Sequence, residues 1–237
     1  MSDMGASVHG DAPVFGVAHS VLGRAWRRRD GDPQQGMNIA EMLEAPDIVG
    51  KILSGRGVLA PQATDFLNPS LRQALPDPST LVDMDKAAAR LADAVQGSEK
   101  IAIFADYDVD GATSAAVLSL YLSELGASPD VYVPDRVAEG YGPNVGALNQ
   151  LADQGARVIV TVDCGIAAHA AFADFGGRAD IIVLDHHQAS EELPGATALV
   201  NPNRLDDLSG LGHLAAVGVT FMAVVALTRE LRARGYF

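Results

Sequence analysis

The sequence contains little cysteine, few aromatic residues and little positive charge. Of its 237 residues, 1 is Cys and 1 is Trp, and 17 Lys and Arg stand against 30 Asp and Glu, which gives a formal net charge of −13. The single cysteine, Cys164, excludes an internal disulfide and fits a reducing compartment, so we expect a cytoplasmic protein. The acidic balance argues against a surface that wraps a polyanion, but it does not exclude a nucleic acid that is held locally.

Long apolar runs are also missing. No run reaches the roughly 18 residues that a membrane span needs, and no basic region followed by an apolar run opens the sequence. Hydrophobic residues nevertheless make up 48% of the chain, which is enough for a well-formed core. These proportions indicate a globular protein of one large or two modest domains.

The chain is organised around residues 101–117. The apolar run 101–105 has the length and β-branched character of a buried strand, and the Ala-rich segment 112–125 is typical of a helix. Asp106, Asp108 and Asp110 lie between the two. Carboxylates this close together repel one another, and a bound cation would offset that repulsion. The segment therefore predicts a divalent metal site.

Other kinds of protein place acids at a similar spacing. An EF-hand loop would need Glu at its twelfth position, where this chain has Val117, and a helix before the loop. A phosphatase that forms an aspartyl-phosphate would have Thr or Val at the position of Asp110, or of Ala112 in the other register. A solvated acidic turn is a further alternative, but it would not account for the acidic strand ends described below.

The N-terminal part predicts a small helical cap. Residues 1–11 are polar and Gly-rich and are expected to be disordered, and residues 27–36 are expected to form a charged, turn-rich loop. Helices are predicted at 38–53, with a break near Pro46, and at 61–67. We therefore assign residues 1–80 to an N-terminal extension and cap.

Residues 81–237 alternate short Val- and Ile-rich runs with helical stretches. Around the central unit, the pattern predicts strands at 131–134, 158–162 and 181–184, and helices at 84–95, 145–154 and 167–175. Such alternation is typical of parallel strands covered by helices on both faces. We predict an α/β fold in which a mostly parallel β-sheet is flanked by helices.

Further acidic and histidine residues follow two of these strands. Asp163 follows strand 158–162, and Asp185, His186 and His187 follow strand 181–184. Because ligands of such sheets bind beyond the carboxyl ends of the strands, we expect these side chains to lie near the three aspartates. Carboxylate oxygens with imidazole nitrogen suit Mn²⁺ or Mg²⁺, and more than four potential ligands indicate two ions that share a bridging Asp. Two metal ions held in this way commonly catalyse the hydrolysis of phosphate esters.

These residues resemble the first three motifs of the DHH phosphoesterases. The motifs are Asp-Tyr-Asp-Val-Asp-Gly-Ala-Thr-Ser at 106–114, Val-Thr-Val-Asp-Cys-Gly at 160–165 and Leu-Asp-His-His-Gln at 184–188. Within that superfamily the chain is more similar to the RecJ-type exonucleases. That similarity comes from Pro-Asp-Arg-Val-Ala-Glu-Gly-Tyr-Gly at 134–142, Val-Asn-Pro-Asn-Arg at 200–204 and His-Leu-Ala-Ala-Val-Gly-Val-Thr-Phe at 213–221. The resemblance extends from about residue 14 to residue 237, and it implies a DHH phosphoesterase domain over 81–237.

The resemblance also implies a role for each polar residue. Asp108 and Asp110 would ligate different ions, Asp163 would bridge the two, and His186 would ligate one. His187 would face the scissile phosphate, Asp106 would support the site from its edge, and Asp185 would orient the imidazoles. The implied catalytic set is Asp106, Asp108, Asp110, Asp163, His186 and His187, with two Mn²⁺ or Mg²⁺ ions as cofactors.

Four more residues are weaker predictions for substrate binding. The resemblance points to Arg136 and Tyr141, although a structural role in their loop explains them equally well. Thr113 and Ser114 open the predicted helix, where backbone N–H groups favour an anion, but helix capping alone would account for them.

The final segment, residues 215–234, predicts a long helix. Its apolar positions are Val217, Phe221, Val224, Val225, Thr228 and Leu231. In the family this region precedes a fourth motif, whose Asp completes the metal site, and then a second catalytic domain and a nucleic-acid-binding module. We therefore expect residues 213–237 to lead into a C-terminal half that is absent here, and the incomplete metal shell to bind one Mn²⁺ more readily than two.

By resemblance, the chain is the catalytic N-terminal part of an exonuclease that degrades single-stranded DNA from its 5′ end in recombination and repair. Single-stranded DNA is the expected partner, together with a single-strand-binding protein or other repair factors, and no membrane is involved. One alternative is a DHH phosphoesterase that acts on short oligonucleotides or cyclic dinucleotides. Another is a catalytically silent DHH scaffold, but the ligands that such a scaffold would have lost are intact.

Overall fold

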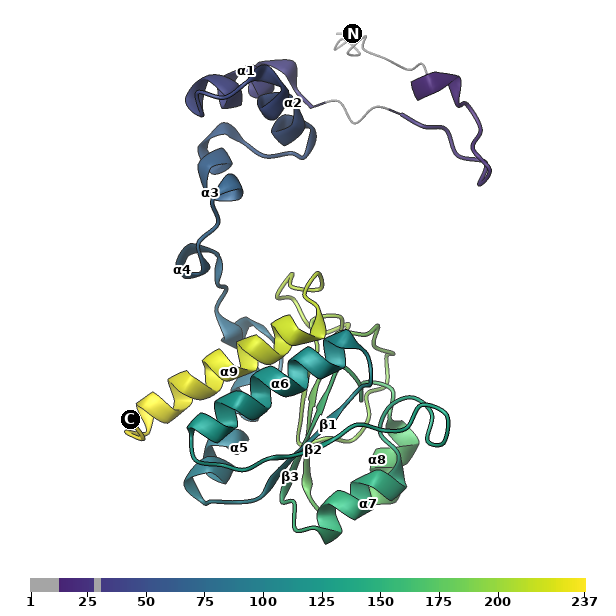
Figure 1. The fold of residues 1–237 in the computed structure, drawn as a ribbon, viewed down its shortest axis with the longest axis vertical. Coiled ribbons are helices and arrows are strands. Elements are labelled where there is room, and N and C mark those ends of the chain that lie inside the picture. The colour runs from purple at the N-terminus through teal and green to yellow at the C-terminus, as the bar shows by residue number, and fades with distance from the viewer. Residues whose placement is uncertain (1–12, 28–30) are drawn as a thin grey trace, which may run out of the picture. The chain divides into compact units, whose positions relative to one another are not determined.

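The computed structural model describes residues 13–27 and 31–237. The chain divides into two compact units, Met1–Leu75 and Pro76–Phe237 (Figure 1). The disorder expected for residues 1–11 lies outside the described residues, as does part of the expected loop 27–36. The assignment of residues 1–80 and 81–237 as functional domains stays a prediction.

The first unit is helical. Its elements are η1 (Val14–Gly16), α1 (Pro33–Met42), α2 (Asp47–Gly55), η2 (Ala60–Gln62), α3 (Ala63–Leu67) and α4 (Leu71–Ala74). The prediction that a loop extends to residue 36 is wrong, because α1 begins at Pro33. Asp32 caps this helix by accepting a hydrogen bond from the Gln34 N–H at 2.9 Å. Helices α1 and α2 pack closely at Gly50, where a Cβ would lie 2.0 Å from the Gly36 carbonyl oxygen.

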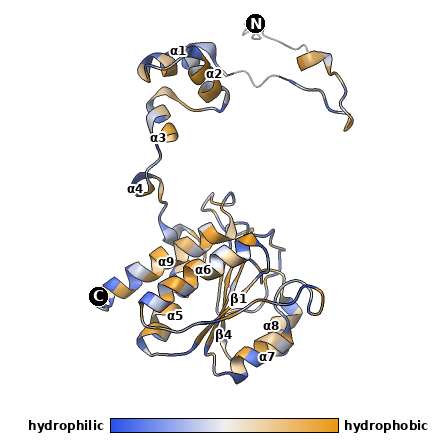
Figure 2. Ribbon diagram, in the orientation of Figure 1, coloured by the Kyte–Doolittle hydropathy of each residue, from blue (hydrophilic) through white to orange (hydrophobic). Residues whose placement is uncertain are grey.

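The second unit is built on a parallel sheet of five strands. The strands are β1 (Ile101–Ala105), β2 (Asp130–Tyr132), β3 (Val158–Val162), β4 (Asp180–Leu184) and β5 (Ala198–Val200), in the spatial order β2-β1-β3-β4-β5. Every residue of β1 and β3 is buried, and β1 and β4 are hydrophobic in Figure 2. The predicted α/β fold with a mostly parallel sheet is confirmed.

Helices cover both faces of this sheet. Helices α5 (Met84–Gln96), α6 (Val109–Glu124) and α9 (Ala216–Ala233) lie together on one face, and α7 (Val145–Asp153) and α8 (His169–Phe175) lie on the other (Figure 1). A short helix, η3 (Pro78–Thr80), precedes α5. Successive side chains of β1 point to opposite faces of the sheet. Ala102 and Phe104 pack on the face that α7 and α8 cover, with Leu148 of α7 and Phe172 of α8. Within the part of the chain that the structure describes, no helix is long and apolar enough to cross a membrane.

Two helices differ from the sequence prediction in ways that affect the site. Helix α6 begins at Val109 rather than at residue 112, because the Asp108 side chain caps it, so Asp110 lies in its first turn. Of the apolar positions predicted for α9, only Leu231 is buried. The buried face instead consists of Ala216, Val219, Thr220, Met222, Ala223, Ala226, Leu227 and Leu231. Strand β5 was not predicted, because three residues are too few to give a period.

Candidate metal centre

The first part of the candidate site is the turn between β1 and α6. Asp108 is the N-cap of α6, and its Oδ1 accepts hydrogen bonds from the N–H groups of Asp110 (2.9 Å) and Gly111 (3.1 Å). The bond from Gly111 lowers the pKa of Asp108, whereas burial raises the pKa of Asp106, which is 4% exposed. The turn is tight enough that a Cβ on Gly111 would lie 2.3 Å from the Asp106 carbonyl oxygen. Glycine is therefore required here for the acids to come together.

Asp163, at the end of β3, is the most unusual acid in the site. It is 1% exposed and has a left-handed backbone with φ of 60°, which is uncommon for a residue other than glycine. Its Oδ1 is buried and has no hydrogen-bond partner among the described residues. Burial, the neighbouring carboxylate of Asp108 and the charge of Asp110 raise the pKa of Asp163 to about 7. A buried, unpartnered carboxylate oxygen is costly unless a cation compensates it.

Asp185, at the end of β4, has the opposite environment although it is equally buried. Its Oδ1 accepts hydrogen bonds from the N–H groups of His186 (2.7 Å) and His187 (3.1 Å) and from Nδ1 of His187 (2.7 Å). Its Oδ2 accepts one from the Ile166 N–H at 3.0 Å. Burial alone would raise the pKa of Asp185, but these hydrogen bonds, first the one from His187, lower it. Asp185 therefore holds the ring of His187 and the backbone N–H groups of both histidines in place.

The ring of His186 is oriented from both sides. Its Nδ1 lies 3.1 Å from the carbonyl oxygen of Leu214. A carbonyl can only accept, so Nδ1 carries the hydrogen and, in the neutral ring, Nε2 has a free lone pair. Nε2 lies 3.4 Å from Oδ1 of Asp163 and 3.5 Å from Oδ2 of Asp110. The lone pair is thus directed at the carboxylates, the arrangement that a metal-binding imidazole requires.

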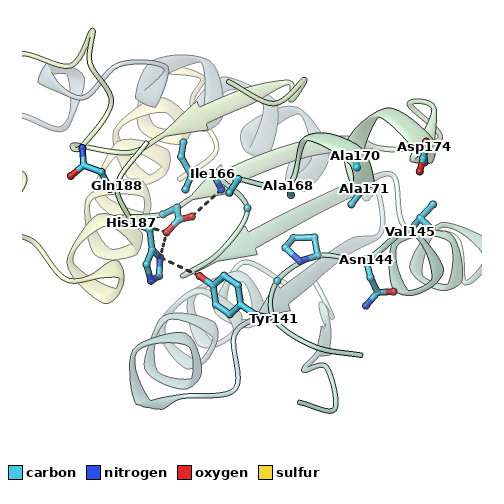
Figure 3. A pocket seen from close by; sticks show the side chains of 15 residues that line it. Tyr141, Asn144, Val145, Ile166, Ala168, Ala170, Ala171, Asp174, His187 and Gln188 are labelled. Carbon is cyan, nitrogen blue, oxygen red and sulfur yellow. Dashed lines mark hydrogen bonds and ion pairs between the residues drawn. The ribbon is translucent and has the colours of Figure 1, made fainter. Parts of the chain in front are cut away.

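His187 is held differently and has a different charge preference. Its Nδ1 donates to Asp185, and this bond raises the pKa of His187 to about 8 despite its partial burial. The hydroxyl of Tyr141 lies 3.4 Å from the same nitrogen (Figure 3). At neutral pH the ring is therefore largely cationic, and a cationic imidazole is suited to an anion rather than to a metal ion.

Two groups of potential ligand atoms meet at Asp163. Asp106, Asp108 and Asp163 form one group, and Asp163, His186 and His187 form the other, with the ligand atoms of each group within 4.8 Å of one another. Asp110 belongs to neither group. Its two carboxylate oxygens instead accept hydrogen bonds from the N–H groups of Ala216 (2.8 Å) and Val217 (2.9 Å) at the start of α9. The structure thus places Asp106 among the acids at Asp163 and directs Asp110 to a helix end.

The four weaker predictions fall in different places. Arg136 is exposed and lies over the ring of Tyr107 at 4.8 Å, and its charge partly opposes the rise that burial causes in the pKa of Asp106. Tyr141 borders the site beside His187. Thr113 bonds back to the carbonyl oxygens of its own helix, and Ser114 is fully buried. The structure therefore keeps Arg136 and Tyr141 near the site and argues against Ser114 as a substrate contact.

Two residues that position the histidines had no predicted role. The buried Asn201 donates from Nδ2 to the carbonyl oxygen of His187 at 2.9 Å, and Asn203 donates from Nδ2 to that of His186 at 2.5 Å. Both lie in the segment 200–204, which the family resemblance included as a block. A carbonyl–amide contact between segments so far apart in the chain has no local sequence pattern, so only that block could have pointed to it.

A pocket of about 550 Å³ adjoins the site next to His187. Figure 3 shows it between the Tyr141–Val145 segment and α8, with His187 at one end. Its walls are mostly small and apolar; they include Pro143, Ile166 and several alanines of α8 and the preceding turn, namely Ala167, Ala168, Ala170 and Ala171. The pocket thus borders Asp185 and His187, and the other polar side chains that line it are Tyr141, Asn144, Asp174 and Gln188.

Comparison with protein families shows which family the chain belongs to. The model described as the DHH family, N-terminal domain, matches residues 100–234, which include every acid and histidine of the candidate metal centre. The chain belongs to the DHH family. The resemblance predicted from the three motifs is confirmed.

The curated relatives of this DHH chain carry one name. Single-stranded-DNA-specific exonuclease RecJ of Bacillus subtilis is 36% identical over 207 residues, which are 87% of this chain and 26% of that protein. RecJ of Escherichia coli is 37% identical over 196 residues, which are 82% of this chain and 33% of that protein. The chain therefore spans about a quarter to a third of the length of these relatives.

Solved structures give the same result. The chain is similar to RecJ in complex with Mn²⁺ from Thermus thermophilus, with a TM-score of 0.68, 26% identity and coverage of 84% of this chain and 28% of that one. It is also similar to an exonuclease RecJ bound to manganese, with a TM-score of 0.58, 32% identity and coverage of 64% of this chain and 38% of that one. These neighbours confirm the α/β fold of the DHH chain.

Proposed function

We propose that this chain is the metal-dependent catalytic part of an exonuclease that hydrolyses single-stranded DNA from the 5′ end. The names of its relatives support the substrate, and the manganese-bound neighbours support the cofactor. The observation that carries the proposal is the buried, unpartnered Oδ1 of Asp163, which is shared by two groups of potential ligand atoms. We infer a role in recombination and repair from the resemblance of the sequence motifs.

The residues present fit a pair of Mn²⁺ or Mg²⁺ ions. Asp106, Asp108 and Asp163 would hold one ion, and Asp163, Nε2 of His186 and Oδ2 of Asp110, which lies 3.5 Å from that nitrogen, would hold the other. This is an oxygen-rich donor set with one imidazole, as hard divalent cations prefer. When bound, such ions activate water and stabilise charge on the phosphoryl oxygens.

The remaining residues act on the substrate and on the histidines. His187, cationic at neutral pH, would contact the scissile phosphate, and Arg136 at the rim would contact a neighbouring phosphate. Asp185 holds the ring of His187 in the protonated form through the bond from Nδ1. Tyr141 packs edge-on against that ring, so it limits the movement of His187.

The pocket beside His187 would take the nucleoside attached to that phosphate. Its volume of about 550 Å³ is of the size of small-ligand sites, and its apolar walls offer few polar groups that could read one base edge. A base that enters such a pocket cannot at the same time be paired, which would favour single strands over duplex. Sequence-independent hydrolysis of single strands is the expected result.

Two other functions remain as alternatives to be tested. A phosphoesterase for short oligonucleotides or cyclic dinucleotides would use the same metal groups, and a silent scaffold would use none of them. Single-strand-binding protein and other repair factors as partners, and the cytoplasmic location, stay predictions from the sequence.

The test is Mn²⁺-dependent release of nucleotides from 5′-labelled single-stranded DNA, with matched duplex, a dinucleotide and a cyclic dinucleotide as competing substrates. We expect 5′-mononucleotides from the single strand and much slower hydrolysis of the duplex. Preferential hydrolysis of the dinucleotide or the cyclic dinucleotide would replace the proposed substrate. Binding of DNA with no hydrolysis in Mn²⁺ or Mg²⁺ would favour the scaffold.

A further inference from the structure

The segment that follows β5 forms a turn that its own sequence specifies. Residues 201–204 read Asn-Pro-Asn-Arg, and the Arg204 N–H donates to the carbonyl oxygen of Asn201 at 3.2 Å, which closes a four-residue turn. Oδ1 of Asn201 also accepts a hydrogen bond from the Asn203 N–H at 2.7 Å. Asn at the first position and Pro at the second favour this turn, because Asn bonds to the N–H two residues on and Pro presets φ. The turn therefore holds Asn201 and Asn203 in a fixed relation.

The two amides of this turn contact different histidines. Nδ2 of Asn201 donates to the carbonyl oxygen of His187 at 2.9 Å, and Nδ2 of Asn203 donates to that of His186 at 2.5 Å. The rings of these histidines have different surroundings: Nε2 of His186 lies 3.4 Å from Oδ1 of Asp163, whereas His187 lines the pocket. Each amide can therefore affect one ring without the other.

Arg204 anchors the turn to the edge of the sheet. Its side chain is 7% exposed, and its Nη1 donates to the carbonyl oxygen of Leu199 at 2.5 Å and to Oδ2 of Asp83 at 3.0 Å. The same oxygen of Asp83 accepts a hydrogen bond from the Leu199 N–H at 3.1 Å. Because β5 is the last strand in the spatial order, these two side chains bond to Leu199 where a further strand would otherwise do so. The turn thus has a fixed position at this sheet edge.

The amide of Asn203 has a close neighbour on the loop before α9. A Cβ at Gly212 would lie 2.6 Å from Oδ1 of Asn203, closer than real Cβ contacts come. The backbone of Gly212 is not in the left-handed region, so glycine is needed here for space rather than for its conformation. Because the amide is the flexible end of a side chain, Gly212→Ala is expected to move it and to leave the backbone in place.

We propose that Asn203 and Asn201 are positioning residues with separate tasks. Asn203 sets the ring of His186, which would bind metal, and Asn201 sets the ring of His187, which would face the scissile phosphate. Each acts through the carbonyl group of one histidine and not as a ligand. The proposal rests on the proposed function for its effect on Mn²⁺ binding, but its effect on the rings does not require a metal.

Three substitutions separate the two tasks. Asn203→Ala removes the donor to His186, and Gly212→Ala displaces that donor. Asn201→Ser keeps a hydroxyl that can accept the Asn203 N–H, as Ser does in such turns, but the side chain is too short to reach the His187 carbonyl. Nitrogen-15 NMR of the metal-free protein reports the environment of each histidine ring, and calorimetry reports the affinity for Mn²⁺.

We expect Asn203→Ala and Gly212→Ala to shift the ring signals of His186 and to leave those of His187 unchanged. Both should lower the affinity for Mn²⁺ by about 10-fold, the lower end of the range for groups that orient a metal-binding residue. Asn201→Ser should shift the ring signals of His187 only and should leave the affinity for Mn²⁺ unchanged.

The matched control is Gly195→Ala, because no atom lies within 4 Å of a Cβ at that exposed glycine, and it should change neither ring nor the affinity. The proposal is overturned if Asn203→Ala and Asn201→Ser shift both rings alike, or if Gly212→Ala leaves the His186 ring unchanged. If Asn201→Ser does not fold, Asn201→Thr is measured in the same way, since its hydroxyl makes the same turn. If the unaltered chain binds no Mn²⁺, the proposed metal centre fails, while the ring signals still decide the positioning roles.

Discussion

The ends of β3 and β4 carry two buried aspartates that differ in their hydrogen bonding. Asp163 and Asp185 are 1% and 0% exposed, and they follow adjacent parallel strands. Asp185 accepts four hydrogen bonds, and its pKa is lowered; Asp163 has a buried oxygen without a partner, and its pKa is raised to about 7. Burial alone therefore does not distinguish a structural acid from a reactive one.

The difference shows how the chain separates support from chemistry. At the end of β4, backbone and histidine donors satisfy the carboxylate, so Asp185 can hold the imidazole of His187 and the backbone of both histidines in fixed positions. At the end of β3, Asp163 and Gly165 have positive φ, a Cβ at Gly165 would lie 2.6 Å from Oγ1 of Thr161, and no donor of the described residues bonds to Oδ1 of Asp163. A bound cation would compensate the carboxylate oxygen of Asp163 that the folded chain leaves without a hydrogen bond.

The largest effect should come from Asp163→Ala. Loss of the acid shared by both groups of ligand atoms should remove Mn²⁺ binding and lower nucleotide release by at least about 10³-fold, the upper range for the loss of one charge-stabilising group. Calorimetry and the single-strand assay measure the two quantities, with the exposed Asp65→Ala as control. Retained turnover in Asp163→Ala would remove the two-ion assignment.

Replacement of each acid by Asn should change stability in opposite directions. In the metal-free protein at pH 8, Asp163→Asn should raise the free energy of unfolding by about 1–3 kcal/mol, because it removes a buried charge on a carboxylate whose Oδ1 has no hydrogen bond. Asp185→Asn should lower it by about 1–3 kcal/mol, because an amide cannot accept all four donors. Urea unfolding measures both. If both substitutions changed the free energy of unfolding in the same direction, the proposed difference between Asp163 and Asp185 would be wrong.

Asp185→Asn should also affect metal binding without removing it. Because Asp185 fixes the backbone of His186 by accepting its N–H, we expect Mn²⁺ affinity to fall by about 10- to 100-fold. Calorimetry measures the affinity, with Asp163→Ala as the reference for complete loss. A complete loss in Asp185→Asn would show that Asp185 does more than orient its neighbours.

The stability of the metal-free protein should depend on pH in a direction set by Asp163 and His187. The folded pKa of Asp163 is about 7 and its ordinary value is 3.8, so the folded state holds the extra proton and stability falls as pH rises between about 4 and 7. The folded pKa of His187 is about 8 and its ordinary value is 6.5, so the stability it contributes is lost as pH rises through 8. Each slope is at most about 1.4 kcal/mol per pH unit.

Urea unfolding at several pH values separates the two groups. In Asp163→Asn the fall between about pH 4 and 6 should disappear, and only the fall that His187 causes between about pH 6.5 and 8 should remain. An unchanged profile in Asp163→Asn would show that Asp163 is not the group that titrates.

The smallest effect should come from the pocket beyond His187. Ala170→Leu places a larger side chain at an exposed position of α8 that lines the pocket, and it should raise the KM for single-stranded DNA by about 3- to 10-fold. Mn²⁺ affinity should not change. Ala173→Leu, an exposed alanine of the same helix outside the pocket, is the control. An equal KM in both variants would remove the pocket from the substrate path.

Much of the fold could be predicted from the sequence, because the pattern in the sheet unit is strong. Strands β1 and β3 have the predicted bounds, since each is a short run of buried apolar residues between turn formers. The buried face of α9 could not be predicted, because nearly every position in its first half is apolar, and contact with α5 and α6 decides which positions are buried. Strand β5 depends on pairing with β4 and has no period of its own.

The site was predictable in its composition and less so in its geometry. The meeting of Asp163 with Asp106 and Asp108 follows from adjacent parallel strands, whose carboxyl ends lie at one edge of the sheet. The contacts of Asp110 with α9 and of Asn203 with His186 join segments that no local rule relates. Spacing in the acidic turn identified the acids, but only the tertiary structure showed which carboxylate is unsatisfied and which is bonded.

Anomalous diffraction from crystals of the chain grown with Mn²⁺ tests the central claim most directly, because it locates each ion relative to Asp163. The account predicts manganese bound to Oδ1 of Asp163, with any second ion on the other side of the same carboxylate toward His186. Manganese held by other residues, with Oδ1 of Asp163 still unpartnered, would contradict it.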